Sequence, residues 1–342
     1  MRKLIKQLSD LRGISGFEYR LNNEIKKMLE PYADEVKTDA LGNVIAIKRC
    51  GKKNAPSVMV EAHCDEIGLM VTSVTKEGFI TFANVGGVDP RILPSLEVTV
   101  HGRRDIFGVV GIKPAHLLED GKSVKIRDMA IDTGLSADEV KELVSVGDSI
   151  TIAQSVGKIG SRQWSGKTLD DRASLAAVIQ LMKNLKNVQL FADVYAVAAV
   201  QEEVGCRGGK VAAYGINPTM AIAIDVTHGI TPDNSDGAFE LGSGAVVAVG
   251  PNIHPMLSKR LFETAKKHKI KTETEVEGGD TGTDAWEMQV AADGIPTALL
   301  SIPLKYMHTS VETLAVSDVE AVTELLENFI KELEEDISWL NL

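Results

Sequence analysis

The sequence has few cysteines, few aromatic residues, a deficit of positive charge and no long apolar run. Its three cysteines, Cys50, Cys64 and Cys206, are an odd and small number, which argues against a disulfide framework and favours a reducing, cytoplasmic compartment. Lysine and arginine total 37 against 48 aspartates and glutamates, a formal net charge of −11. A chain this acidic is a poor binder of phosphate backbones, so we expect no nucleic-acid partner.

No apolar stretch approaches the roughly 18 residues that a membrane-spanning helix needs, so we expect no membrane partner. The first residues carry positive charge without an uninterrupted apolar stretch after them, and no secretory signal is expected. The remaining composition, 44% hydrophobic and 25% charged, is that of a globular protein, and 342 residues indicate about two domains.

Helix-like and strand-like periodicities alternate at both ends of the chain. Two helices are predicted within residues 1–32, the second opened by a capping box of Ser15 and Glu18, and a last helix is predicted with a capping box of Ser317 and Glu320. The other predicted helices cover 171–185 and 255–267, and the predicted strands cover 43–48, 57–61, 191–200, 220–224, 245–250, 271–277 and 297–302.

The middle of the chain has a different texture. Short β-like runs separated by Gly, Pro and Asp turns are predicted at 69–74, 79–85, 96–100, 107–112 and 149–153, with one helix near 136–144. Neither α/β piece makes a complete sheet alone. We therefore predict an α/β fold in which one domain, residues 1–65 plus 165–342, is interrupted by a β-rich insertion of residues 66–164.

Several apolar segments end in residues that ligate metals. His63 follows the strand-like run at 58–60, and Asp65 comes two residues later, where a carboxylate can accept the second N–H of the imidazole. Asp225 follows another apolar strand, and His308 lies a few residues past a third. Ligands bind at the carboxyl ends of strands in open α/β sheets, so these side chains are candidates for one site.

Acidic residues also occur in adjacent pairs. Asp170 and Asp171 open a predicted helix, where ordinary capping is the alternative, and Glu202 and Glu203 end a strongly apolar strand. Because alternate residues of an extended chain point to opposite sides, one glutamate can ligate a metal while the other serves as a general base. The combined histidines and carboxylates suit zinc, cobalt or manganese in an open site with two ions.

These segments closely resemble the TET-type co-catalytic metallo-aminopeptidases, which include glutamyl, leucyl and lysyl aminopeptidases and some members labelled endoglucanase. The matching segments span nearly the whole chain in the order of that family: 61–68, 85–90, 169–173, 200–205, 224–227 and 306–308. The resemblance implies a three-layer α/β/α exopeptidase domain with an inserted, β-barrel-like dimerisation domain. It also implies a homo-oligomer, either a dimer or a tetrahedral dodecamer.

The resemblance further implies a role for each candidate residue. His63 and Asp225 would hold one divalent metal ion, Glu203 and His308 a second, and Asp170 would bridge them. Glu202 would be the general base and Asp65 would orient His63. Asp171 would shape the turn beside the bridge, Cys64 would point away from the metals, and the segment 278–285 would lie near the substrate cleft. The implied substrates are peptides, cut at the N-terminus.

Two other enzymatic readings compete with this one. A glycoside hydrolase needs two carboxyl groups across a sugar ring, at roughly 5 to 9.5 Å, and aromatic platforms that a chain with 5% aromatic residues scarcely offers. A di-metal carboxypeptidase or N-acyl deacylase would use similar ligands but recognise a substrate carboxylate. An inert scaffold on the same fold is a third, non-catalytic reading, disfavoured because every candidate position is filled. The preferred N-terminal residue is open: basic residues are expected if Asp233, Asp236, Glu240 and Asp280 line the first pocket.

Overall fold

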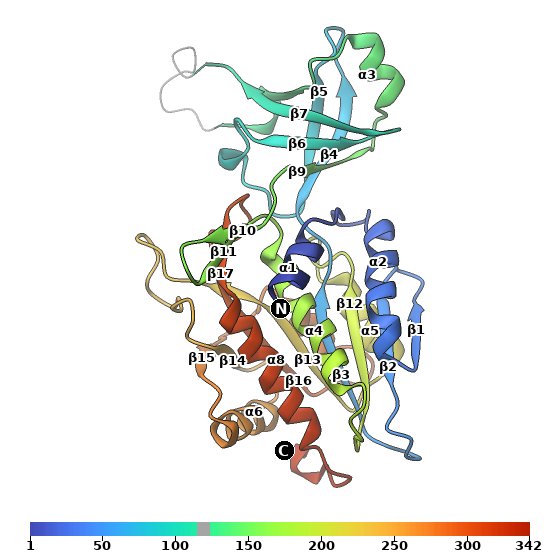
Figure 1. Cartoon of the computed structure of the whole chain (residues 1–342), viewed down its shortest axis with the longest axis vertical. Coiled ribbons are helices and arrows are strands. Elements are labelled where there is room, and N and C mark those ends of the chain that lie inside the picture. The colour runs from blue at the N-terminus through green and yellow to red at the C-terminus, as the bar shows by residue number, and fades with distance from the viewer. Residues whose placement is uncertain (115–123) are drawn as a thin grey trace.

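The computed structural model describes residues 1–114 and 124–342 (Figure 1). A layered α/β body carries both chain termini, and a β-barrel with one helix projects from one end of it. The predicted α/β fold with a barrel-like insertion is confirmed.

The body is built on an 11-stranded mixed sheet. Its strand order is β1 (Glu35–Thr38), β2 (Val44–Lys48), β12 (Asp193–Ala199), β3 (Ser57–His63), β13 (Met220–His228), β16 (Thr297–Lys305), β17 (Glu312–Ala315), β11 (Gln163–Gly166) and β10 (Gly157–Ile159), with β14 (Ala245–Val249) and β15 (Thr272–Val276) branching from β16. The central strands β12, β3, β13 and β16 are parallel and almost entirely buried, as their continuous apolar sequences require.

Helices cover both faces of this sheet. One face packs against α1 (Arg2–Ser9), α2 (Tyr19–Leu29), α4 (Leu169–Leu185), α6 (Pro255–His268) and α8 (Val316–Lys331). The other face packs against α5 (Arg207–Ile216) and α7 (Asp284–Met288). Alternation along β3 sends Val58 and Val60 into the first core and Met59 into the second, so His63 lies on the α5/α7 side.

The closed barrel has the strand order β4 (Gly68–Val74), β5 (Ile80–Val85), β8 (Met129–Asp132), β7 (Asp105–Ile112), β6 (Glu97–His101) and β9 (Ser149–Ile152). Every pairing in it is antiparallel, and it encloses a separate apolar core. Helix α3 (Ala137–Leu143) begins with a capping box of Ser136 and Glu139. The chain leaves the body after β3 and returns before β10.

Two predicted capping boxes are wrong. Helix α2 begins at Tyr19 without a side-chain cap, because Glu18 Oε1 accepts from the N–H groups of Gly16 (2.8 Å) and Gln201 (3.1 Å) instead. Helix α8 likewise has no side-chain cap and begins at Val316.

Helix α5 had no sequence prediction. Its Gly208 and Gly209 lower helix propensity, yet a Cβ at Gly208 would lie 2.3 Å from the Val200 carbonyl oxygen and one at Gly209 would lie 2.5 Å from Asp284 Cγ. Close packing therefore requires both glycines. Strand β17 and the short helix α7 also formed without a prediction.

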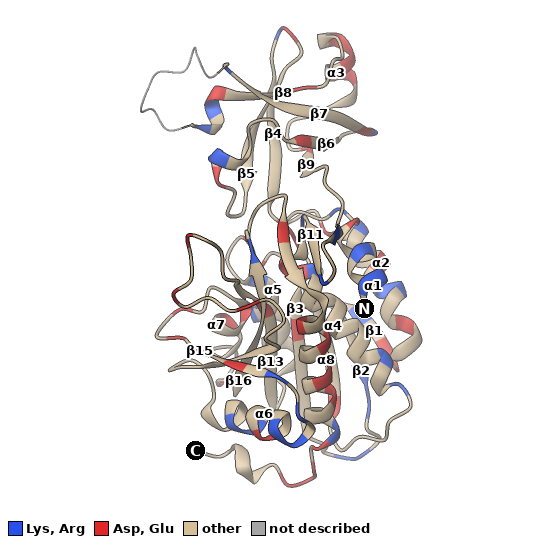
Figure 2. Ribbon diagram, turned by 60° about the vertical axis from the view of Figure 1, so that its left-hand side comes forward, with Lys and Arg blue, Asp and Glu red and all other residues tan. Residues whose placement is uncertain are grey.

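Charged residues are spread over the surface of the body. Figure 2 shows lysines and arginines on α1, α2 and α6, at separate places, and acidic residues along α8. Within the two described stretches of the chain, no helix is both long and apolar enough to cross a bilayer.

Candidate metal centre

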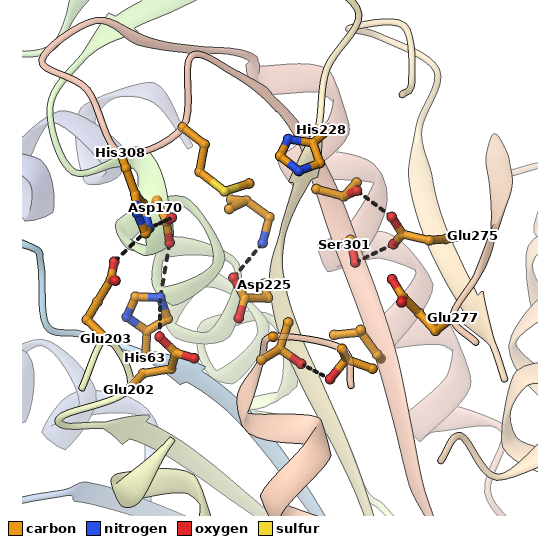
Figure 3. Close-up of a pocket in the computed structure, with 17 residues that line it drawn as sticks. His63, Asp170, Glu202, Glu203, Asp225, His228, Glu275, Glu277, Ser301 and His308 are labelled. Atoms are coloured by element: carbon orange, nitrogen blue, oxygen red, sulfur yellow. Dashed lines mark hydrogen bonds and ion pairs between the residues drawn. The ribbon is translucent and has the colours of Figure 1, made fainter. Parts of the chain in front are cut away.

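The candidate residues converge at the carboxyl ends of the central parallel strands (Figure 3). His63 is the last residue of β3, and Asp225 lies in the neighbouring strand β13. In β13, Ile224 and Val226 face the α4 core while Ala223 faces α5 and α7, so Asp225 shares the sheet face of His63. The fold thereby brings together two side chains that are more than 160 residues apart in sequence.

Three loops supply the remaining side chains. Asp170 opens α4, Glu202 and Glu203 form the turn between β12 and α5, and His308 lies between β16 and β17. Asp170 Oδ1 lies 3.0 Å from His63 Nε2, and Asp170 Oδ2 lies 3.2 Å from His308 Nε2. Glu203 Oε1 is also 3.2 Å from His308 Nε2. Asp170 thus faces a different histidine with each oxygen.

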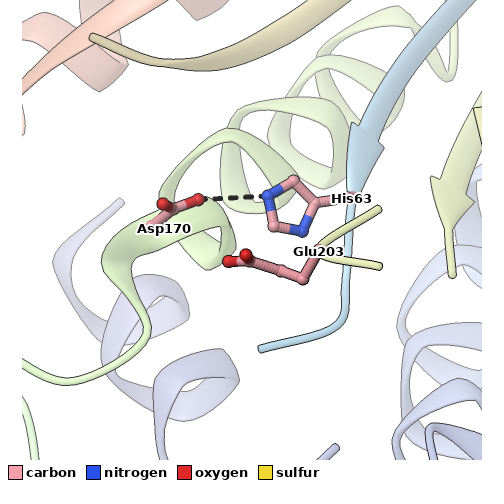
Figure 4. A group of neighbouring side chains, drawn as sticks. All are labelled: His63, Asp170 and Glu203. Atoms are coloured by element: carbon pink, nitrogen blue, oxygen red, sulfur yellow. Dashed lines mark hydrogen bonds and ion pairs between the residues drawn. The ribbon is translucent and has the colours of Figure 1, made fainter. Parts of the chain in front are cut away.

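Two overlapping groups of side chains are close enough to hold a cation. Ligand atoms of His63, Asp170 and Glu203 lie within 4.8 Å of one another (Figure 4), and so do those of His63, Asp171 and Asp225. The peptide bond between Asp170 and Asp171 is cis. Both carboxylate oxygens of Asp171 are buried without a hydrogen-bond partner among the described residues.

Burial and mutual repulsion make Glu202 and Asp225 hard to ionise without a cation. Burial raises the pKa of Glu202 to about 9 and that of Asp225 to about 8, and neighbouring carboxylates add to both shifts. Burial lowers the pKa of His308, but its hydrogen bonds to Asp170 and Glu203 outweigh this and raise the pKa to about 11. Divalent cations would relieve this crowding, and imidazole with carboxylate donors fits zinc, cobalt or manganese.

The ring of His308 is oriented by the backbone of the β5 end. His308 Nδ1 donates to the Gly87 carbonyl at 3.1 Å, so its Nε2 points to Asp170 and Glu203. A Cβ at Gly87 would lie 2.9 Å from His308 Nδ1, which leaves room for glycine only. The segment 85–90 had been matched to the family without a role for Gly87, and this contact supplies one.

Glu312 holds two ligand-bearing segments at once and had no sequence prediction. Its Oε2 accepts from the N–H of Asp170 (3.1 Å), and its Oε1 accepts from the N–H of His308 (3.0 Å). Burial raises the pKa of Glu312 well above its ordinary value, and repulsion by Asp170 adds to the shift. An isolated glutamate at the start of a short strand carries no sequence signal for such a role.

Asp65 supports the turn that carries the two glutamates. It accepts from the N–H of Glu202 (3.0 Å), the N–H of Glu203 (3.2 Å) and the hydroxyl of Ser15 (2.6 Å). Its Oδ1 lies 3.5 Å from His63 Nδ1, longer than these bonds. The predicted orientation of His63 by Asp65 stays a prediction, while the contacts to the turn are the shorter ones.

Several backbone positions around the site are strained. Non-glycine residues with left-handed φ flank each loop that supplies a side chain: Thr168 (69°), Gln201 (59°), Cys206 (52°), Tyr306 (59°) and His308 (59°). Such conformations persist only where surrounding contacts over-determine them, and they cluster at functional sites. The bonds from Glu312 and Asp65 to these loops are contacts of that kind.

Two cysteines are close in sequence to candidate site residues, and the thiol of each contacts a protein side chain. Cys64 is fully buried in the α4 core, and its Sγ contacts Asn22 Oδ1 at 3.5 Å, in agreement with the expectation that it points away. Cys206 Sγ donates to Glu202 Oε1 at 3.1 Å, a contact that the sequence did not suggest.

The cluster opens into a cavity of about 310 Å³. Its outer part is lined by Thr227, His228, Glu275, Glu277, Ser301 and the segment 281–283. Within the described part of the chain, the lining includes none of Asp233, Asp236, Glu240 and Asp280, so these acids do not meet the condition on which a basic N-terminal preference was expected.

A family model built from known proteins matches most of the chain. The sequence model of M42 glutamyl aminopeptidases matches residues 42–325. The lysyl aminopeptidase of Pyrococcus furiosus is 38% identical over 342 residues, 97% of each chain.

Solved structures agree with the sequence match. An aminopeptidase from the archaeon Desulfurococcus kamchatkensis superposes with a TM-score of 0.92 at 32% identity, covering 99% of this chain and 96% of its own. The TET1 peptidase of Pyrococcus horikoshii, which can assemble into a tetrahedron or a large octahedral shell, has a TM-score of 0.86 at 33% identity, covering 97% and 99%. A Thermotoga maritima protein named endoglucanase has a TM-score of 0.79 at 30% identity, covering 96% of each chain.

The Gly87 contact can be tested by adding one methyl group. Gly87→Ala should weaken zinc or cobalt binding roughly 10- to 100-fold, because it displaces the ring of His308 from Asp170 and Glu203. Isothermal titration of the metal-stripped protein measures this. Gly111→Ala in the barrel is the matched control, since its Cβ would meet nothing closer than 3.6 Å. Equal affinities for the two variants would contradict the role of Gly87.

Proposed function

Since this chain belongs to the M42 glutamyl aminopeptidase family and is therefore a peptide hydrolase, we propose that it removes N-terminal residues with two divalent cations and Glu202 as the general base. The observation that best supports the proposal is the position of Asp170, whose two oxygens face His63 and His308 at 3.0 and 3.2 Å. One cation would be held by His63 and Asp225, the other by Glu203 and His308, with Asp170 shared. Zinc or cobalt fits these donors best, and manganese also fits.

Bound cations of this kind lower the pKa of a shared water, polarise the scissile carbonyl and hold a free α-amine. Glu202 supplies the proton transfers. Its Oε1 accepts from the Cys206 thiol, and its Oε2 lies 3.9 Å from His63 Nε2, on the side of the cluster. From there Oε2 can take a proton from the attacking water and deliver it to the leaving amine nitrogen.

The lining of the cavity argues against the competing enzyme classes. Among the described residues that line it there is no tryptophan, tyrosine or phenylalanine to stack on a sugar. There is also no lysine or arginine to bind the carboxylate that a carboxypeptidase or deacylase recognises. An inert scaffold would not need the crowded, partly unpartnered carboxylates seen here.

We further propose that the protein is a cytoplasmic homo-oligomer that pairs through the barrel, as a dimer or a larger shell. Strand β7 alternates between buried and exposed residues, and its exposed side carries Phe107 (57% exposed) and Val109 (40% exposed). Apolar side chains adjacent on one strand face favour a protein contact. The three free cysteines are compatible with a reducing compartment.

Replacing the general base should separate catalysis from metal binding. Glu202→Gln should lower kcat roughly 10²- to 10⁴-fold while the metal content stays that of the parent protein, because the carboxylate is assigned to proton transfer. Glu203→Gln should instead lose metal. Activity on Leu-p-nitroanilide and metal analysis of the same samples measure both effects, with the exposed Glu240→Gln as the control. Full activity in Glu202→Gln with metals bound would refute this assignment.

Substrate class can be settled with a paired assay. The metal-loaded protein should hydrolyse free aminoacyl-p-nitroanilides, fail on their N-acetylated forms and fail on soluble cellulose. A chelator should abolish the activity and zinc or cobalt should restore it. Chelator-insensitive release of sugar, or faster cleavage of the acetylated substrate, would favour one of the competing classes.

The barrel contact predicts a change in assembly. Phe107→Asp should raise the dissociation constant of the dimer at least about 30-fold, because it places a charge in an apolar contact. Sedimentation over a concentration series measures this. Val276→Asp is the control, an exposed apolar strand residue of the body (79% exposed). An unchanged assembly in Phe107→Asp would show that β7 does not carry the contact.

A further inference from the structure

The cavity contains two sets of acidic residues with different surroundings. Asp170, Glu202, Glu203 and Asp225 surround the two histidines of the metal centre. Glu275 and Glu277 lie across the cavity from them, on and just after β15 (Figure 3). Neither Glu275 nor Glu277 has a role in the proposed metal centre.

The strand register explains why both glutamates face the cavity. Strand β15 runs parallel to β14, with Glu275 opposite Ala248, and Ala248 packs into the core on the α5/α7 side of the sheet. Glu275 therefore shares the sheet face of Asp225. Glu277 is two residues further on, and its N–H donates to the Val249 carbonyl, so it continues the same alternation.

Glu275 is held in place by hydroxyl groups from β13 and β16. Its Oε1 accepts from the Thr227 hydroxyl, and its Oε2 accepts from the Ser301 hydroxyl at 3.2 Å. Thr227 is two residues beyond Asp225 on β13, and Ser301 is the register partner of Asp225 on β16. The Glu275 carboxylate thus contacts a hydroxyl that lies two strand residues, roughly 7 Å, beyond Asp225 along β13, a span comparable with an extended lysine side chain.

Glu277 is the less satisfied member of the pair. The described residues offer its carboxylate no hydrogen-bond or salt-bridge partner, although it is half-buried. Burial raises the pKa of Glu277, and repulsion by Glu275 and Asp280 adds to the shift. A cationic guest would relieve that repulsion, whereas an anionic guest would increase it.

The two sets of carboxylates differ in whether bound cations would neutralise their charge. Two divalent cations would balance the four inner carboxylates but not Glu275 and Glu277, and no lysine or arginine is found among the described lining residues. We propose that Glu275 and Glu277 form a subsite that selects substrates whose N-terminal residue has a lysine or arginine side chain. This inference rests on the proposed aminopeptidase function, since it places the first side chain of the substrate beside the metal centre.

The test compares lysine with its uncharged analogue. The metal-loaded protein should cleave Lys- and Arg-p-nitroanilide with a higher kcat/KM than norleucine-p-nitroanilide, which keeps the chain length and lacks the charge. Glu277→Gln should lower the ratio of kcat/KM for lysine to that for norleucine roughly 10- to 100-fold, the range for a hydrogen bond to a charged group. Glu275→Gln should lower it in the same direction.

A matched control and a charge reversal complete the design. Glu273→Gln alters the same strand at an exposed residue outside the lining, and its ratio should equal that of the parent protein. Glu277→Lys should shift the preference toward Glu-p-nitroanilide, a gain that misfolding cannot produce.

The possible failures are distinguishable. A parent protein that prefers norleucine or glutamate over lysine, or a ratio that Glu277→Gln leaves unchanged, would overturn the subsite while the aminopeptidase function stands. A preference for glutamate would point to His228, which also lines the cavity, as the selecting residue. A metal-loaded protein that cleaves none of the nitroanilides would overturn the proposed function itself.

Discussion

The rest of the site depends on one constraint, the close approach of buried carboxylates and imidazoles at the ends of parallel strands. Asp170 lies between two histidines, and Glu202, Glu203 and Asp225 are buried around them. Groups of like charge at such distances repel one another unless a cation lies between them. Bound cations would relieve that repulsion, and the hydrolytic chemistry proposed for the site would use the same cations.

The loops around the site are held by hydrogen bonds from their backbone to buried carboxylates. Asp65 and Glu312 are buried, and each accepts hydrogen bonds from two N–H groups of loops that supply ligands. Left-handed φ angles at Gln201 and His308 become tolerable because these bonds hold the loops. Such loops pre-organise the ligands before a cation binds, which reduces the ordering cost of binding.

Charge is graded along the cavity. The inner acids face histidines and the outer pair, Glu275 and Glu277, faces strand hydroxyls and open space. A single sheet face carries both, because Asp225 on β13, Ser301 on β16 and Glu275 on β15 point to the same side of the sheet. Catalysis and side-chain selection are thereby separated by position on one rigid sheet rather than by different domains.

The sequence by itself determined the α/β class, the β-rich insertion and the family, and it suggested the candidate site residues, because buried parallel strands are continuous apolar runs and polar residues at their ends stand out. Only the tertiary structure decided which side chains support the loops of the site and which are placed to select the substrate side chain. Glu312, Gly87 and the outer pair Glu275 and Glu277 act through contacts with residues distant in the chain, and local periodicity does not reveal such contacts. Whether Asp233 and Asp280 line the first pocket was open for the same reason, since a charged loop looks alike in sequence whether it lines a cavity or faces solvent, and the structure leaves both outside the lining.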